Sequence, residues 1–154
     1  MPLTSETSAV RTLAVGDLHE IDLPVRWGDM DALAHLNNTV YFRLMEEARM
    51  QILEGAGLKV PADDGPILAH ASCDFVKPVT YPATVCVRHR VASLGRSSMT
   101  LDLELFVPGE PSDVYARGRN VLVWMDYRVN QSCPWPVEVL ARLAAVMPQP
   151  RQWP

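Results

Sequence analysis

A polar turn between a strand-like run and a helix-like run gathers side chains that can move protons. Within ten residues the chain places Asp29, Asp31, His35, Asn37 and Asn38, directly before an apolar periodic stretch. The first backbone N–H groups of a helix have no intrahelical partner, and the helix dipole favours negative charge there. A carboxylate can act as nucleophile or base, and a preorganised N–H can stabilise an oxyanion. We therefore take this turn as the candidate active site.

The residues of the turn have different expected roles. Asp31 lies seven positions before Asn38, so a tight loop could bring both to one reacting carbonyl; the alternative is that Asp31 only caps the turn. Asp29 is expected to orient Asp31 or to accept loop N–H groups, and two close carboxylates would raise the pKa of one of them. His35 is expected to stabilise the loop, to lie near a substrate, or to act as a base.

The turn does not match a metal-ion motif. A calcium loop needs Gly at its sixth position and an acid at its twelfth, and this run has neither. It also lacks zinc-ligand spacing, so we expect no metal and no redox cofactor. The three cysteines, Cys73, Cys86 and Cys133, form no C-x-x-C pair and are predicted to be reduced thiols.

The helices and strands predicted around the turn indicate an α+β fold. Residues 19–27 alternate as a strand, with Pro24 favouring an edge position, and residues 38–54 have helical apolar spacing with Asn37 or Asn38 as N-cap. The apolar arc of this helix is wide, which predicts an enclosed helix, and Arg43 and Glu47 are spaced to form an ion pair. Four further strands in meander order and a short final helix are predicted at residues 67–77, 84–92, 99–107, 114–129 and 137–146.

The bulk properties limit the class of protein. A length of 154 residues predicts one domain, with residues 1–18 as a loose lead-in and 134–154 as a tail carrying the short helix. The formal net charge of −4 gives no general attraction to nucleic acid or to anionic membranes. No apolar run approaches the roughly 20 residues of a membrane span, and the first residues lack a signal-peptide pattern, so we expect a cytoplasmic protein.

At residues 29–49 the chain reads D-M-D-A-L-A-H-L-N-N-x-x-Y-F-x-x-x-E-x-A-R. This string resembles the signature of hotdog-fold acyl-CoA thioesterases of the 4-hydroxybenzoyl-CoA thioesterase type. The similarity extends to DFVKPVTYP, VASLGRSSM and YARGRNVLVWMDYR, which resemble strands and a turn of that family. The resemblance implies a hotdog fold, in which an antiparallel sheet wraps around one long central helix. It also implies a homodimer joined sheet edge to sheet edge, often paired into a homotetramer, with active sites at the dimer interface.

The resemblance assigns roles to individual positions. Asp31 matches the catalytic aspartate, and Asn38 matches the helix-start residue whose backbone N–H polarises the thioester carbonyl. Arg96, with Ser97 and Ser98, matches a turn that often meets the phosphates of coenzyme A. Two further arginines near that hairpin, Arg88 and Arg90, are either an ordinary solvated face or part of a phosphate patch.

Two positions qualify this match. Glu46 corresponds to the family's E-x-A-R acid and is a candidate second acid. Ala34 stands where the family usually has Gly; if that position needs a positive φ, Ala would be strained there.

We therefore expect an enzyme that hydrolyses an acyl-CoA to free acid and coenzyme A, without a cofactor. One alternative is a hotdog hydratase or dehydratase acting on an enoyl or hydroxyacyl thioester, with His35 and an acid. Another is a non-catalytic acyl-CoA binding protein. The pattern leaves open the acyl group, and it does not decide between coenzyme A and acyl carrier protein.

Overall fold

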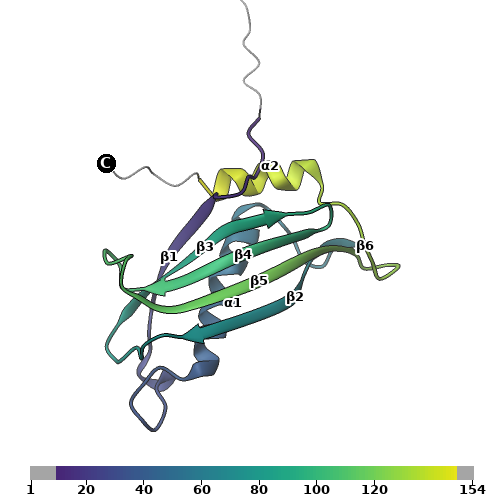
Figure 1. Ribbon diagram of the computed structural model, residues 1–154. Coiled ribbons are helices and arrows are strands. Elements are labelled where there is room, and N and C mark those ends of the chain that lie inside the picture. The colour runs from purple at the N-terminus through teal and green to yellow at the C-terminus, as the bar shows by residue number, and fades with distance from the viewer. Residues whose placement is uncertain (1–9, 149–154) are drawn as a thin grey trace, which may run out of the picture.

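One antiparallel sheet dominates the computed structural model, which describes residues 10–148. Its strands lie in the order β1-β3-β4-β5-β2, and a short β6 pairs with the end of β5 (Figure 1). The elements are β1 (Leu18–Pro24), α1 (Asn38–Gly55), β2 (Asp64–Phe75), β3 (Thr84–Leu94), β4 (Ser98–Phe106), β5 (Val114–Asp126), β6 (Gln131–Ser132) and α2 (Val137–Val146). The predicted α+β class and antiparallel sheet are confirmed.

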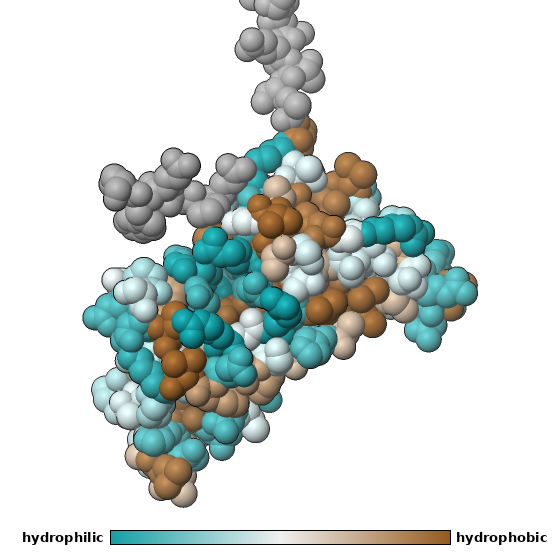
Figure 2. Space-filling model, in the orientation of Figure 1, coloured by the Kyte–Doolittle hydropathy of each residue, from teal (hydrophilic) through white to brown (hydrophobic). Residues whose placement is uncertain are grey.

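The two faces of the sheet differ because apolar and polar residues alternate along the strands. On β4, Met99, Leu101, Leu103 and Leu105 are buried on the face that meets α1, while the residues between them are half-exposed on the other face. We call the face away from α1 the outer face. Figure 2 shows hydrophilic residues gathered over much of it.

Helix α1 begins where its cap predicts, and it packs one side on the sheet. Asn37 is the N-cap, because its side chain accepts the N–H of Thr39. The helix buries Tyr41, Leu44, Met45, Ala48, Arg49, Ile52 and Leu53. Phe42 and Met50, however, remain 39% and 45% exposed. The prediction of an enclosed helix is therefore wrong for the single chain.

The predicted Arg43–Glu47 ion pair is absent from the described part of the chain. Glu47 instead accepts a hydrogen bond from Gln51 at 3.0 Å, one turn further along the helix. Both arrangements use the same i,i+4 spacing, so the helix itself is unaffected.

Strand β2 departs from the predicted meander. Strands β3, β4 and β5 follow one another as expected, but β2 crosses to the far edge and pairs only with β5. Its other edge has no partner strand within residues 10–148, and Ile67, Leu68 and Phe75 are 40–42% exposed along it. An open strand of 12 residues with apolar side chains is a ready template for pairing with another chain.

Strand β1 forms the opposite edge, which confirms the position that Pro24 predicted. It ends at Pro24, earlier than expected. Trp27 falls in a short 3-10 helix (Trp27–Asp29) and is 77% exposed, so its predicted place on a strand face is wrong.

Part of the predicted loose lead-in is packed. Leu13 is buried, and its N–H donates to Leu140 of α2. Arg11 pairs with the buried Asp17 at 2.7 Å and donates to two carbonyls at the end of α2. Residues 1–9 and 149–154 of the predicted lead-in and tail lie outside the described residues. Between residues 10 and 148, neither helix has the length and apolar character needed to cross a membrane.

Candidate active site

Asp31 closes the turn before α1 with one of its carboxylate oxygens. Its Oδ1 accepts the N–H groups of Leu33 at 2.8 Å and His35 at 3.2 Å, and its own N–H donates to the His35 carbonyl at 2.8 Å. The capping role is therefore real. Among residues 10–148, the other oxygen, Oδ2, accepts no hydrogen bond. The half-buried carboxylate is fixed through one oxygen and has the other available for a reactant.

Ala34 adopts the left-handed conformation that the sequence comparison raised as a possibility. Its φ is +58°, and its N–H donates to the Asp31 carbonyl at 3.0 Å. A side chain at this φ costs roughly 1–2 kcal/mol, and glycine avoids that cost. The turn thus keeps the shape that a glycine would allow, at the expense of local strain.

Asp29 accepts backbone N–H groups on both sides of the turn. Its Oδ2 accepts the Arg26 N–H at 2.8 Å, and its carbonyl accepts the Asn37 N–H at 2.9 Å. These bonds match the expectation that Asp29 binds loop N–H groups. Its contacts position the start of α1 relative to the 3-10 helix.

His35 ties the turn to the segment after β2. It forms an isolated β-bridge with Thr80, and the neighbouring Leu36 N–H donates to the Val79 carbonyl at 2.8 Å. In the described part of the chain its imidazole makes no hydrogen bond and is half-buried. The backbone of His35 therefore has a structural role, and its ring is left free.

The first turn of α1 leaves one N–H group unused. The Asn37 side chain takes the Thr39 N–H at 2.9 Å, and the Asn37 carbonyl takes the Val40 N–H at 2.9 Å. The Asn38 N–H has no acceptor among residues 10–148. It belongs to the first helical residue, where the helix dipole also favours negative charge.

Glu46 lies two turns into α1 and borders two grooves. On one side is a groove of about 620 Å³ that it shares with Asp29 and Pro24. On the other is a groove of about 280 Å³ between α1 and β2. The structure thus brings Glu46 and Asp29 to one groove, whereas Asp31 lines neither groove.

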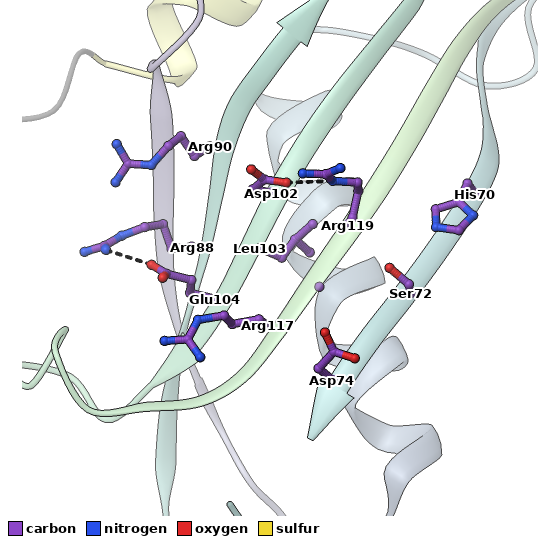
Figure 3. A pocket seen from close by; sticks show the side chains of 11 residues that line it. His70, Ser72, Asp74, Arg88, Arg90, Asp102, Leu103, Glu104, Arg117 and Arg119 are labelled. Carbon is purple, nitrogen blue, oxygen red and sulfur yellow. Dashed lines mark hydrogen bonds and ion pairs between the residues drawn. The ribbon is translucent and has the colours of Figure 1, made fainter. Parts of the chain in front are cut away.

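Arg88 and Arg90 lie on the outer face of the sheet, away from α1 (Figure 3). In register across five strands, Glu20, Arg88, Glu104, Arg117 and Asp74 form a row of alternating charge. Arg88 contacts Glu20 at 2.5 Å and Glu104 at 3.1 Å, so its charge is already neutralised. Arg90 has no ion-pair partner in the described chain and is the freer of the two.

Arg96, Ser97 and Ser98 lie at the other end of the sheet from Asp31. The Arg96 carbonyl accepts the Trp135 N–H at 3.0 Å, near the start of α2, whereas His35 lies by Thr80, before the start of β3. The 11 residues of β3 separate these ends by about 33 Å at roughly 3.3 Å per residue. Asp31 and Arg96 therefore lie at opposite ends of the sheet in one chain.

Another groove, of about 960 Å³, lies at the Arg96 end of the sheet. It runs between the end of α1, the loop after it and α2. Its apolar lining includes Met50, Leu58, Pro66, Trp124 and Val139.

Two buried polar side chains, Arg49 of α1 and His89 of β3, were not among the predicted site residues. Arg49, only 9% exposed, donates to Asn120 at 3.0 Å, and His89 is fully buried with no partner for either ring nitrogen in the described chain. Burial lowers the pKa of His89 to about 3, and the nearby Arg49 and His19 add to this. Arg49 could have been identified from the sequence, because it is a charged residue on the apolar stripe of the helix, four positions after Met45. His89 lies within β3 and packs in the core.

The Thioesterase-like superfamily is the family whose model matches this chain, over residues 25–143. The chain belongs to this superfamily. The match includes the Asp31 turn, the groove between α1 and β2, and most of α2.

Solved structures support the same assignment. The PA2801 protein of Pseudomonas aeruginosa, a proposed thioesterase, is 40% identical, with 77% of this chain and 92% of that chain covered and a TM-score of 0.73. A proposed acyl-CoA thioesterase of Xanthomonas campestris is 30% identical, with 75% and 95% covered and a TM-score of 0.64. Together with the family match, these similarities support a thioester hydrolase.

A more distant relative is a chloroplastic acyl-acyl carrier protein thioesterase of Arabidopsis thaliana. It is 26% identical over 117 residues, which cover 73% of this chain. The chain spans 60% of that relative's length.

Proposed function

We propose that this thioesterase-family protein hydrolyses an acyl-CoA thioester to the free acid and coenzyme A. The supporting observation is that one turn holds both an unused carboxylate oxygen, on Asp31, and an unused helix N–H, on Asn38. These are the two groups that the reaction requires, a base or nucleophile and an oxyanion donor.

The chemistry follows from these two groups. In the general-base form, Asp31 takes a proton from water as the water oxygen bonds to the thioester carbon. The carbonyl oxygen gains negative charge and accepts the Asn38 N–H. When the carbon–sulfur bond breaks, the thiolate leaves with the electron pair and is protonated. In the nucleophilic form, Asp31 itself attacks the carbonyl carbon, the carbon–sulfur bond breaks and the thiolate leaves and is protonated, and water then hydrolyses the resulting anhydride to the free acid and the Asp31 carboxylate. No metal or redox cofactor takes part in either form.

The proposed active unit is a homodimer with the hotdog fold. The open edge of β2 would pair with β2 of a second copy in antiparallel orientation. Such pairing would cover Phe42 and Met50, the apolar residues that α1 leaves exposed, and the joined sheet would wrap around the helices. The further pairing of dimers into a tetramer remains a prediction.

A dimer of this kind also gives Arg96 and the large groove a role. Antiparallel pairing places the Arg96 end of one subunit beside the Asp31 end of the other. The phosphates of coenzyme A would then meet Arg96, Ser97 and Ser98 of the partner subunit. Arg90 is the weaker candidate because it lies on the outer face, and Arg88 is already paired.

The acyl group would enter the partner's groove of about 960 Å³. Leu58, Trp124 and Val139 would contact the apolar part of the acyl group, although charged residues such as Glu54 and Arg142 also line the groove. The Arabidopsis relative is named for acyl carrier protein substrates, so an acyl carrier protein thioester belongs among the substrates to test. We also propose a cytoplasmic location.

The test is release of thiol from a panel of short, long, branched and aromatic acyl-CoAs, followed with a thiol-reactive dye. Asp31→Asn keeps the size of the side chain but removes the base, so turnover should fall by about 10²-fold or more. Asp29→Asn is the matched control in the same turn and should retain most of the activity.

Three other results would each favour a different function or a different catalytic acid. Turnover that survives Asp31→Asn would overturn its role and transfer the chemistry to Glu46. Loss of enone absorbance from crotonyl-CoA without thiol release would favour a hydratase instead. Tight acyl-CoA binding without turnover in the wild type would favour a binding protein.

A further inference from the structure

The small groove between α1 and β2 contains a buried positive charge without a negative partner. Arg49 is 9% exposed, and its one hydrogen-bonded partner in the described chain is the neutral side chain of Asn120, at 3.0 Å. No carboxylate among residues 10–148 comes within 4 Å of its guanidinium. Burial lowers the pKa of Arg49, and nearby Glu46 partly offsets this. Buried charges in proteins are nearly always paired, so this groove is incomplete in one chain.

The position of the groove indicates what completes it. It is lined on one side by Thr39, Phe42 and Glu46 of α1, and on the other by Leu68 and Ala71 of β2. Strand β2 runs from residue 64 to residue 75, so Leu68 and Ala71 flank its midpoint. A two-fold axis that pairs β2 with its own copy along its full length passes through that midpoint. The groove would therefore face the same groove of the second copy.

Among residues 10–148, only one acidic residue lines this groove. Its charged residues are Arg43, Glu46 and Arg49, and Arg43 is exposed to solvent. Glu46 is exposed, lies one turn before Arg49, and makes no ion pair in the described chain. Two facing copies thus place an unpaired carboxylate opposite an unpaired buried guanidinium, twice.

We propose that Glu46 of each subunit pairs with Arg49 of the partner subunit, forming two symmetric ion pairs across the dimer axis. This inference rests on the proposed homodimer. It assigns Glu46 a role in assembly rather than in proton transfer.

The decisive experiment mixes two charge-reversed variants, Glu46→Arg and Arg49→Glu. Each homodimer would carry two repulsive pairs, so its dissociation constant, measured by sedimentation, should rise tenfold or more. In a mixed dimer one subunit carries two positive groups and the other two negative groups, so both cross-subunit pairs are restored. Mixing should return dimer formation and thiol release to near wild-type levels.

A pair within one chain predicts the opposite. Each variant would then contain its own repulsive pair, and mixing would restore nothing; that result would overturn the proposal. Glu47→Arg is the matched control, because Glu47 is the neighbouring exposed acid but lines the other groove. It should leave the dissociation constant within about threefold of wild type.

A milder set of variants covers the case in which Arg49→Glu fails to fold. Glu46→Gln and Arg49→Gln should each weaken the dimer, and the double variant should be hardly weaker than the worse single variant. Effects that multiply independently would contradict the pairing. A wild-type protein that stays monomeric but active would overturn the proposed dimer itself, whereas a stable dimer without this coupling would overturn only the ion pair.

Discussion

Two arginines on opposite faces of the sheet show how this chain distributes its charges. Arg88 lies on the outer face with its side chain 15% exposed, and it contacts two carboxylates. Arg49 is a residue of α1, is 9% exposed, and contacts no carboxylate in the described chain. Because burial removes water from a charged group, an unpaired charge on Arg49 is costly. The difference indicates that Arg88 is paired within one chain, whereas the carboxylate proposed for Arg49 comes from a second chain.

The sharpest way to test this contrast is to remove each arginine. Arg49→Met should lower the free energy of unfolding of the assembled protein by about 3 kcal/mol, because Asn120 loses its partner and the proposed cross-subunit pair is lost. Arg88→Met should cost less, about 1 kcal/mol, because the carboxylates that pair with it, Glu20 and Glu104, are 41% and 32% exposed and can be solvated once Arg88 is gone. Chemical denaturation at one protein concentration measures both. Equal costs would remove the distinction between the two faces.

His89 is a buried group on the same side of the sheet as Arg49, and its burial disfavours the protonated form. Its pKa is lowered to about 3 in the folded chain, against an ordinary value of 6.5. The unfolded chain therefore binds a proton that the folded chain does not as the pH falls below about 6.5. Stability is fully present above that pH, and about 2–3 kcal/mol should be lost by pH 4.5.

Denaturation at a series of pH values measures this loss. His89→Phe should flatten the acid limb of the stability profile, whereas His70→Gln, at an exposed position on β2, should leave it unchanged. A wild-type profile that is flat from pH 6.5 to pH 4.5 would show that His89 is not held neutral.

A smaller effect is expected in the turn itself. Ala34→Gly removes the strain of φ +58° but adds freedom to the unfolded chain, so the net gain should be about 0.5 kcal/mol. Ala32→Gly, at a position without positive φ, should instead destabilise by a similar amount. Thermal denaturation of the two variants compares them directly. A loss for Ala34→Gly would mean that the turn does not store strain at this residue.

Local patterns in the sequence predicted much of this structure. Alternation located β3, β4 and β5, and the cap at Asn37 located the start of α1. The D-x-D string located the turn, and the usual glycine in the family pointed to the unusual backbone at Ala34. These features depend on residues close together in the chain, where spacing and backbone preference carry the information.

Features that depend on distant pairing were not predictable in the same way. Nothing local in residues 64–75 shows that β2 pairs with β5 rather than with β3. The same holds for the separation of Arg96 from Asp31, which follows from strand order and length. The unpaired state of Arg49 appears only once Asn120 and the open edge of β2 are placed around it.

In the proposed dimer, one chain carries only part of each active site. The most direct measurement is the specific activity of the wild type for thiol release across a dilution series, with the dimer fraction determined by sedimentation at the same concentrations. We expect activity per chain to fall in proportion to the dimer fraction. Full activity in a solution of monomers would contradict it.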